Sequence, residues 1–185
     1  MDHYIEIRLL PDPEFPPNVL MNALFSKLHR SLALQGQGTI GLSFPQEGKG
    51  GLGTHLRLHG TAMDLAGFLA LDWQVGMRDH TAVGPVLPVP ALKGYRVVRR
   101  VQAKSNPERL RRRLVARKGV SAEEARQAIP DSVAELLDLP FVVINSRTTG
   151  QQFRLFVEHL PVRDEPVTGP FSAYGLSPVA TVPWF

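Results

Sequence analysis

The chain has 185 residues, of which 43% are hydrophobic and 21% are charged, a balance typical of a globular protein with a core. It contains no cysteine, which excludes disulfide bonds and cysteine-ligated metal sites. No apolar run approaches the roughly 18 residues that a membrane span requires, and the start, MDHYIEIRLL, lacks the regions of a signal peptide. We therefore expect a cytoplasmic protein with no membrane partner, built as one large domain or two small ones.

The net charge of +4 is distributed unevenly along the chain. Between Lys93 and Lys118 there are eleven basic residues and one acid, Glu108. Because the whole chain has 21 basic and 17 acidic residues, the remainder holds 10 basic and 16 acidic ones. Positive charge concentrated in this way steers a polyanion to one face of a protein. A solvated surface helix is the alternative, but the density of charge favours a polyanionic partner.

Hydrophobic periodicity predicts the elements of the first half of the chain. Residues 3–9 alternate between apolar and polar, as in a half-buried strand with Ile5, Ile7 and Leu9 on its buried side. In Val19–Gln35, leucine recurs every four residues, as on the apolar face of a helix, and two glycines follow. The pattern then predicts a strand, a glycine-rich turn, a second strand, a helix and a short strand at residues 40–44, 48–53, 55–59, 61–71 and 80–83.

The order strand, helix, strand, strand, helix, strand within about 85 residues is the ferredoxin-like arrangement, which many RNA-recognition modules share. The segment THLRLHG has no aromatic residue on which a base could stack, so we do not expect this unit to bind single-stranded RNA as those modules do. Residues 85–94 are rich in proline and indicate a boundary. We expect an α+β protein with a ferredoxin-like domain at 1–90 and a second α+β domain at 91–185.

The second domain is predicted to begin with a basic strand and to continue with an arginine-rich helix at residues 106–118. That helix opens with a capping box of Ser105 and Glu108, or with Asn106 as the cap, and ends at Gly119. The pattern next predicts a short helix that starts at a second capping box, a helical turn, and a strand hairpin closed by a Thr-Thr-Gly turn: residues 121–130, 133–137 and 141–159.

The basic residues of the predicted helix fall largely on one face, formed by Arg109, Arg112 and Arg113 with Arg117 at its border. Two leucines form a neighbouring apolar stripe that would dock the helix on its own protein. Arginine outnumbers lysine, and its guanidinium binds phosphates and guanine edges through paired hydrogen bonds. This choice favours nucleic acid over a membrane surface, which would also require bulky exposed apolar residues.

Just before the helix, Arg100, Gln102 and Lys104 share one face of the predicted strand. Arginine pairs with guanine, and glutamine with adenine, through two hydrogen bonds each. Base-specific reading by these side chains is therefore plausible. A hydrogen bond from Gln102 to the backbone explains its presence equally well, and the residues alone leave both interpretations open.

The segments MDHYIEIRLLPDPEFPP and VQAKSNPERLRRRL, with the ending PWF, resemble the CRISPR-associated endoribonuclease of type I-F systems over nearly the whole chain. That family cuts the precursor of CRISPR RNA within its repeat hairpin. The resemblance implies metal-independent cleavage at the base of the stem-loop, product ends of a 2′,3′-cyclic phosphate and a 5′-hydroxyl, and retention of the product. It implies no cofactor. The implied partners are the repeat RNA hairpin and other subunits of a type I-F surveillance complex.

The resemblance also assigns roles to particular residues. The catalytic roles fall on His29 in SKLHRSL, Ser146 in INSRTTG and Tyr174 in SAYGLS. In the family, an arginine and a glutamine read bases and an aromatic residue stacks on the terminal base pair of the stem. With these and the basic face of the helix, the expected RNA-binding set is Arg100, Gln102, Lys104, Arg109, Arg112, Arg113, Arg117, Lys118 and Phe153.

The sequence departs from the family pattern at two positions. Thr148 stands where a serine is expected, which is a mild change. Ala116 interrupts the arginine stripe where another basic residue is expected. That change removes one phosphate contact or reflects a different repeat sequence.

The expected chemistry accounts for these residue types. Metal-free RNA cleavage is attack by a ribose 2′-hydroxyl on the adjacent phosphate, and histidine, with an ordinary pKa near 6.5, suits the general base. Ser146 would hold the ribose, and Tyr174 would orient the imidazole of His29. A lysine or arginine must stabilise the phosphorane, and the sequence does not identify which one. The scattered acids, with His55 and His59, present no closed set of metal ligands.

Two other functions fit parts of the pattern. An RNA-binding scaffold subunit would share the basic helix but would have no need of His29, Ser146 and Tyr174 together. A DNA-binding regulator would require helix-turn-helix spacing around the basic helix, and the sequence has none.

Overall fold

The structure is a computed structural model that describes residues 1–102, 107–130, 137–145, 150 and 152–185. It forms two compact units: Met1–Val101 together with Leu139–Phe185, and Gln102–Asp138. The expected division into domains after residue 90 remains a proposal. In the described part of the chain, no helix combines the length and the apolar character needed to cross a membrane.

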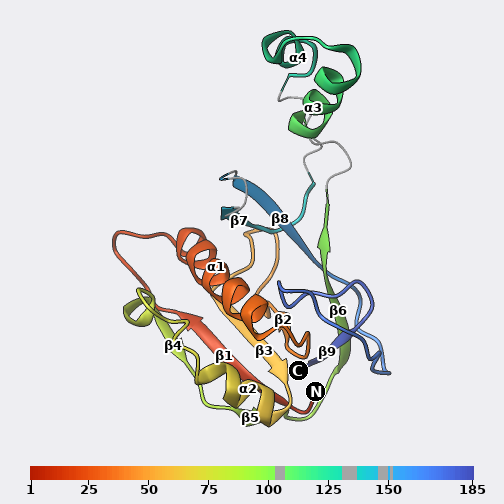
Figure 1. Cartoon of the computed structure of the whole chain (residues 1–185). Coiled ribbons are helices and arrows are strands. Elements are labelled where there is room, and N and C mark those ends of the chain that lie inside the picture. The colour runs from red at the N-terminus through yellow and green to blue at the C-terminus, as the bar shows by residue number, and fades with distance from the viewer. Residues whose placement is uncertain (103–106, 131–136, 146–149, 151) are drawn as a thin grey trace. The chain divides into compact units, whose positions relative to one another are not determined.

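The first unit starts with the predicted order of elements (Figure 1). These are β1 (His3–Leu9), α1 (Pro17–Gln35), β2 (Gly41–Ser43), β3 (His55–Gly60), α2 (Ala62–Leu69), the 3-10 turn η1 (Arg78–His80), β4 (Thr81–Val83) and β5 (Leu87–Pro88). The strands are antiparallel, in the order β2-β3-β1-β4, and β5 also pairs with β1. The predicted α+β class and its ferredoxin-like order are confirmed.

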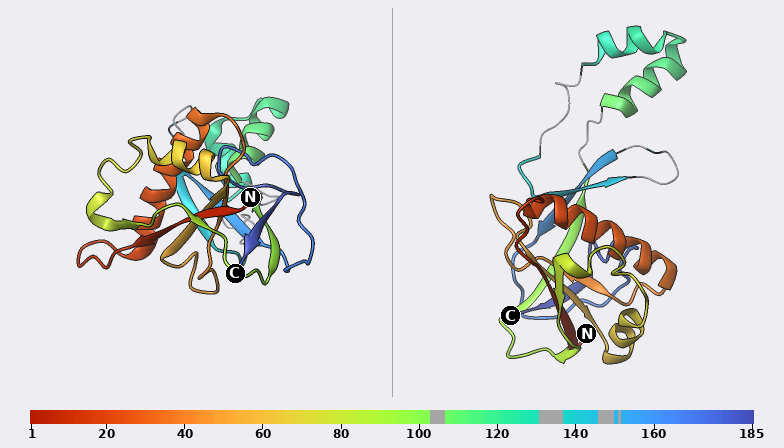
Figure 2. Two further views of the ribbon diagram at one scale, coloured as in Figure 1. Left: turned by 90° about the horizontal axis from the view of Figure 1, so that it is seen from below. Right: turned by 90° about the vertical axis from the view of Figure 1, so that its left-hand side faces the viewer.

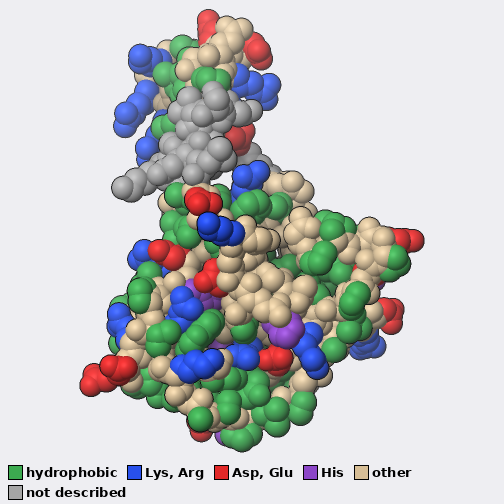
Figure 3. Space-filling view, turned by 180° about the vertical axis from the view of Figure 1, so that it is seen from behind, with side chains coloured by type: hydrophobic (Ala, Val, Ile, Leu, Met, Phe, Trp, Pro, Cys, Tyr) green, Lys and Arg blue, Asp and Glu red, His purple; other side chains and the backbone are tan. Residues whose placement is uncertain are grey.

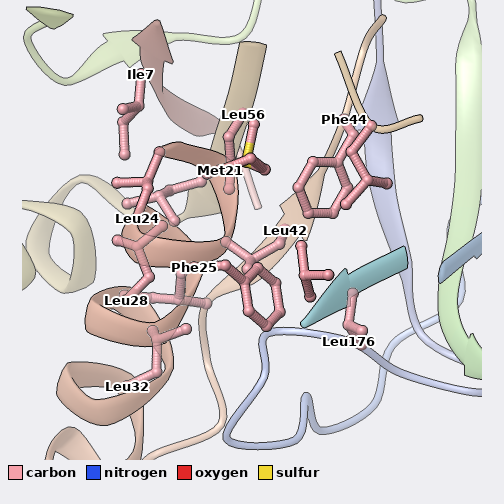
Figure 4. Close-up of a cluster of buried hydrophobic side chains, with 14 of the residues drawn as sticks. Ile7, Met21, Leu24, Phe25, Leu28, Leu32, Leu42, Phe44, Leu56 and Leu176 are labelled. Carbon is pink, nitrogen blue, oxygen red and sulfur yellow. The ribbon is translucent and has the colours of Figure 1, made fainter. Parts of the chain in front are cut away.

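Helices α1 and α2 cover one face of this sheet (Figures 1 and 2). Helix α1 starts with Pro17, whose ring fixes a helical φ, and ends at Gly36, which has a left-handed φ of 67°. Its apolar stripe packs on the buried side chains of the strands, among them Ile7 and Leu56 (Figure 4). The stripe consists of Leu20, Met21, Leu24, Phe25, Leu28 and Leu32.

A second antiparallel sheet completes the first unit, with strand order β7-β8-β6-β9. Its strands are β6 (Gly94–Val101), β7 (Phe141–Asn145), β8 (Gln152–His159) and β9 (Thr181–Trp184). The predicted hairpin of β7 and β8 is confirmed. Strand β9 was not predicted, because the segment TVPW contains a proline and is only four residues long. Buried side chains of this sheet, including Val142 and Leu155, belong to the same core as α1.

The alternation of β3 correctly predicts Leu56 and Leu58 as buried but places His59 on a polar face. In the structure His59 has no exposed surface. Other chain segments cover that face: a Cβ on Gly41 would lie 2.6 Å from Val182 of β9. The face that the sequence pattern marks as polar is therefore partly a second buried layer.

The second unit contains α3 (Pro107–Lys118) and α4 (Ala122–Ala128). Gly119, with a φ of 65°, donates its N–H to the carbonyl of Val115 and ends α3 as predicted. The capping box of Ser121 and Glu124 at the start of α4 is also confirmed. The expected cap at residues 105–106 and most of the expected turn at 133–137 lie outside the described residues.

Candidate active site and nucleic-acid interface

His29 lies on α1, one turn after the buried Phe25, with its side chain only partly exposed. Its Nδ1 is 2.8 Å from the carbonyl oxygen of Ala173. A carbonyl oxygen can only accept a hydrogen bond, so the proton of the neutral imidazole is on Nδ1. Nε2 then retains its lone pair, which is the state that a proton acceptor requires.

Tyr174 fixes the plane of this imidazole. The rings of His29 and Tyr174 are stacked, with centroids 4.1 Å apart and an interplanar angle of 16°. Phe25 lies nearly parallel to Tyr174, at a centroid distance of 6.4 Å. Two side chains on successive turns of α1 therefore face one tyrosine ring, which links the imidazole to the core.

The chain segment that carries Tyr174 is tied to β2 by a close backbone approach. Leu42 donates its N–H to the carbonyl of Gly175 at 2.8 Å. Gly175 has a φ of 68°, and a Cβ there would lie 2.4 Å from the side chain of Leu42. Only glycine combines this conformation with this spacing. The position of Tyr174 is thus set by the backbone of the core.

Arg100 and Phe153 extend the cluster. Arg100 lies near the end of β6 and Phe153 on β8, and the guanidinium carbon is 5.5 Å from the Phe153 ring and 5.4 Å from the Tyr174 ring. Both distances are within the range of a cation–π contact. Four of the residues that the sequence singled out, His29, Tyr174, Arg100 and Phe153, therefore come together in the first unit.

Other predicted site residues cannot be placed in this way. Ser146 follows directly after β7, but Ser146 and Lys104 lie outside the described residues, as does Thr148. Strand β6 ends at Val101, so Gln102 follows the strand instead of sharing its face with Arg100 as predicted. The side chain of Gln102 is exposed.

The basic residues expected to bind RNA on α3 are all exposed to solvent: Arg109, Arg112, Arg113, Arg117 and Lys118. Figure 3 shows Lys and Arg side chains projecting from this unit. Arg111 differs from them, since its Nε donates to the carbonyl of Ile129 at 2.7 Å and so ties the two helices together. Helix α3 has no fully buried side chain.

Two buried histidines were not identified as special from the sequence. Ser43 Oγ lies 2.8 Å from Nε2 of His59, and the N–H of Phe44 donates to Nε2 of His159 at 3.2 Å. Burial lowers the pKa of each imidazole to about 3, and the nearby Arg57 and Arg96 act in the same direction. Both histidines are therefore neutral parts of the core.

The ending PWF has a structural explanation. The guanidinium of Arg96 lies 4.5 Å from the Trp184 ring, and that of Arg57 lies 4.1 Å from the Phe185 ring. Arg57 also donates to the backbone oxygen of Phe185 at 3.0 Å. These contacts join β9 to both sheets. Among the described residues, no group of three or more His, Asp and Glu side chains could hold a metal ion.

Comparison with known proteins places these features in a family. Residues 4–185 match the family described as CRISPR-associated protein (Cas_Csy4). A protein named CRISPR-associated endonuclease Cas6/Csy4, from Pseudomonas aeruginosa (strain UCBPP-PA14), is 55% identical over 187 residues, which cover all of both chains. A protein of the same name from Escherichia coli (strain UTI89 / UPEC) is 50% identical over 185 residues, again all of both chains.

Since both full-length relatives are CRISPR-associated endonucleases by name, this α+β protein is a CRISPR-associated endoribonuclease. More particularly, the chain belongs to the Cas_Csy4 family, the endoribonucleases of type I-F systems. The resemblance expected from the sequence is confirmed.

Proposed function

We propose that this protein cuts CRISPR precursor RNA at the base of the repeat stem-loop, without a metal ion, and stays bound to its product. The observation that carries the proposal is the arrangement of His29, whose Nδ1 is held by Ala173 and whose ring is stacked on Tyr174. The names of the two relatives, both CRISPR-associated endonucleases, support the choice of a CRISPR RNA as substrate.

In the proposed reaction, Nε2 of His29 takes the proton of a ribose 2′-hydroxyl. The freed oxygen attacks the adjacent phosphorus, the P–O2′ bond forms and the P–O5′ bond breaks. The departing 5′ oxygen takes a proton from the imidazolium or from water. The products are a 2′,3′-cyclic phosphate and a 5′-hydroxyl. A positioned general base typically contributes about 10²- to 10⁴-fold to such a rate.

Tyr174 acts in this scheme as a positioning residue. Its ring restricts rotation of the imidazole, while the carbonyl of Ala173 selects the tautomer. Ser146, which follows the last residue of β7, is proposed to hold the ribose, the role that the family resemblance assigns to it. The cation that stabilises the phosphorane is a lysine or arginine not yet identified.

Recognition of the hairpin is proposed to use two groups of residues. In the first group, Arg100, whose guanidinium lies against Tyr174, reads bases together with Gln102, and Phe153 stacks on the terminal base pair of the stem. On α3, the exposed basic residues and Lys104 before them bind phosphates in the groove of the hairpin. An A-form major groove is narrow, but long arginine side chains enter it near the open end of a short hairpin.

Retention of the product follows because the residues that bind phosphates on α3 are distinct from those that cut the RNA. The contacts of α3 do not depend on the bond that is cut, so they persist after cleavage. A protein that keeps its product would then pass with it into a larger CRISPR complex, whose other subunits are the remaining proposed partners.

The test is incubation of the purified protein with end-labelled repeat hairpin RNA in excess EDTA, followed by a denaturing gel. The proposal predicts one cut at the stem base, with a cyclic phosphate on the upstream fragment. Tight binding with no cut in EDTA, and a cut once Mg²⁺ is restored, would contradict the metal-free mechanism. Tight binding without any cut would instead indicate an RNA-binding scaffold.

A further inference from the structure

Asn22 makes a hydrogen bond that joins the helix carrying His29 to the second sheet. It lies on α1, and its Oδ1 accepts the N–H of Val143, on β7, at 2.9 Å in a partly buried position. Asn22 precedes His29 by seven residues. Seven residues are two helical turns, or about 10 Å, so both side chains lie on the same side of α1.

The bond uses an edge of the sheet that would otherwise be unpaired. In the described residues, β7 pairs only with β8, and it stands at the end of the strand order. The N–H of Val157 on β8 donates to the carbonyl of Pro140, so the N–H groups of alternate β7 residues, Val143 among them, point away from β8. The side-chain oxygen of Asn22 accepts the hydrogen bond that a further strand at this edge would otherwise accept.

The hydrogen bond between Val143 and Asn22 is directional, whereas the surrounding apolar contacts are not. The N-terminal half of α1 lies beside β7 (Figures 1 and 2), and Val142 and Ile144 are part of the core that α1 covers. Apolar side chains tolerate small shifts of a helix along its axis. A hydrogen bond of 2.9 Å does not, because it weakens steeply when its length or angle changes.

Strand β7 leads directly to Ser146: its last residue is Asn145. We propose that Asn22 is a positioning residue that sets the position of His29 relative to the end of β7, at Asn145. This inference rests on the proposed function, in which His29 and Ser146, the residue that follows Asn145 in the sequence, act on the same ribose. It adds a residue that contacts neither the RNA nor the imidazole.

The expected effect is on the rate of cleavage and not on binding. Asn22→Leu removes the acceptor at similar size, and the single-turnover rate should fall about 10- to 100-fold, since misplacement of a catalytic group by about 1 Å has this effect. The affinity for a hairpin with a 2′-deoxy scissile nucleotide should stay within about 2-fold of the wild type, because the RNA-binding residues are unchanged. Asn22→Asp keeps an oxygen acceptor, and it should restore the wild-type rate to within about 3-fold.

Gln46 supplies the matched control, since its Oε1 accepts from the N–H and the hydroxyl of Thr54 in the connection between β2 and β3. Gln46→Leu should change the melting temperature but leave the cleavage rate unchanged. Equal slowing by Asn22→Leu and Gln46→Leu, or an Asn22→Leu rate equal to wild type, would overturn the inference. Asn22→Ala, which adds no apolar bulk, gives the same comparison if the leucine variant does not fold.

The same gel separates the two proposals. If the wild-type protein does not cut in EDTA, the proposed function is wrong, and this inference fails with it. If the wild-type protein and Asn22→Leu cut equally well, only the proposed role of Asn22 is wrong.

Discussion

The imidazole of His29 is held in two independent ways. The carbonyl of Ala173 fixes the position of one proton, and the Tyr174 ring fixes the plane. The hydrogen bond to Ala173 uses Nδ1, so it leaves Nε2 as the nitrogen proposed to act on RNA. Substitutions of Tyr174 and of His29 itself give two predictions at this scale.

Tyr174→Phe keeps the stacked ring and should leave the single-turnover rate within about 3-fold of the wild type, whereas Tyr174→Ala should lower it about 10- to 100-fold. The reason is that ring packing, and not the hydroxyl, faces the imidazole at 4.1 Å. Rate constants measured with enzyme in excess over labelled hairpin check this. If the phenylalanine variant loses as much activity as the alanine variant, the hydroxyl has a direct role.

His29→Ala should abolish cleavage while hairpin affinity stays close to that of the wild type. The substitution removes the proton acceptor but none of the proposed RNA contacts. Filter binding and a cleavage gel on the same protein test the two halves of this prediction. Loss of binding together with cleavage would mean that His29 acts in recognition and not in chemistry.

At the scale of elements, the arginines of α3 have two different roles. Arg111 is committed to the carbonyl of Ile129 and holds the helix pair together, while Arg113 is exposed. Sequence position alone does not separate these neighbours, but the helical face on which each lies does. Among the described residues of this unit only Ala125 is fully buried, so the hydrogen bond of Arg111 is an important link between its two helices.

Arg113→Ala should therefore weaken hairpin binding and lower the slope of log Kd against log salt by about one contact. Arg78→Ala is the matched control, because it removes the same charge from a residue of the first unit that pairs with Asp72 and is not among the proposed RNA contacts. Its slope should remain that of the wild type. Binding titrations across a range of KCl concentrations measure both, and an unchanged slope for Arg113→Ala would exclude that residue from the phosphate contacts.

For the molecule as a whole, the buried imidazoles predict how stability depends on pH. His59 and His159 have pKa values of about 3 when folded, against an ordinary 6.5. Between these values the unfolded chain binds more protons, so the free energy of unfolding falls as the pH falls below 6.5. Each histidine contributes a slope of up to about 1.4 kcal/mol per pH unit.

Urea unfolding at pH 7, 6 and 5 measures this loss of stability. Imidazole NMR signals provide the direct check, since those of His59 and His159 should show no protonation at pH 5 in the folded protein. A titration midpoint near 6.5 for both would contradict the prediction, because it would mean that the folded protein does not penalise their charge.

Local patterns predicted much of the fold and part of the site. The leucine repeat of α1, the alternation of β1 and the cap at Ser121 depend on neighbours in sequence, and all three are confirmed. The burial of His59 and the pairing of β9 depend on segments more than 80 residues apart, and no local pattern reports them. Likewise, His29 and Tyr174 were chosen by resemblance, whereas Asn22 emerged only from its bond to β7.

The position of Arg100 has a consequence for any attempt to retarget this protein. Its guanidinium faces both the Phe153 ring, proposed to receive the last base pair, and the Tyr174 ring behind the histidine. On the proposed function, replacing Arg100 to accept a different base also alters what lies against Tyr174. One side chain would therefore affect both the base preference and the cleavage rate. An engineer would therefore have to reoptimise the rate whenever the preferred repeat is changed.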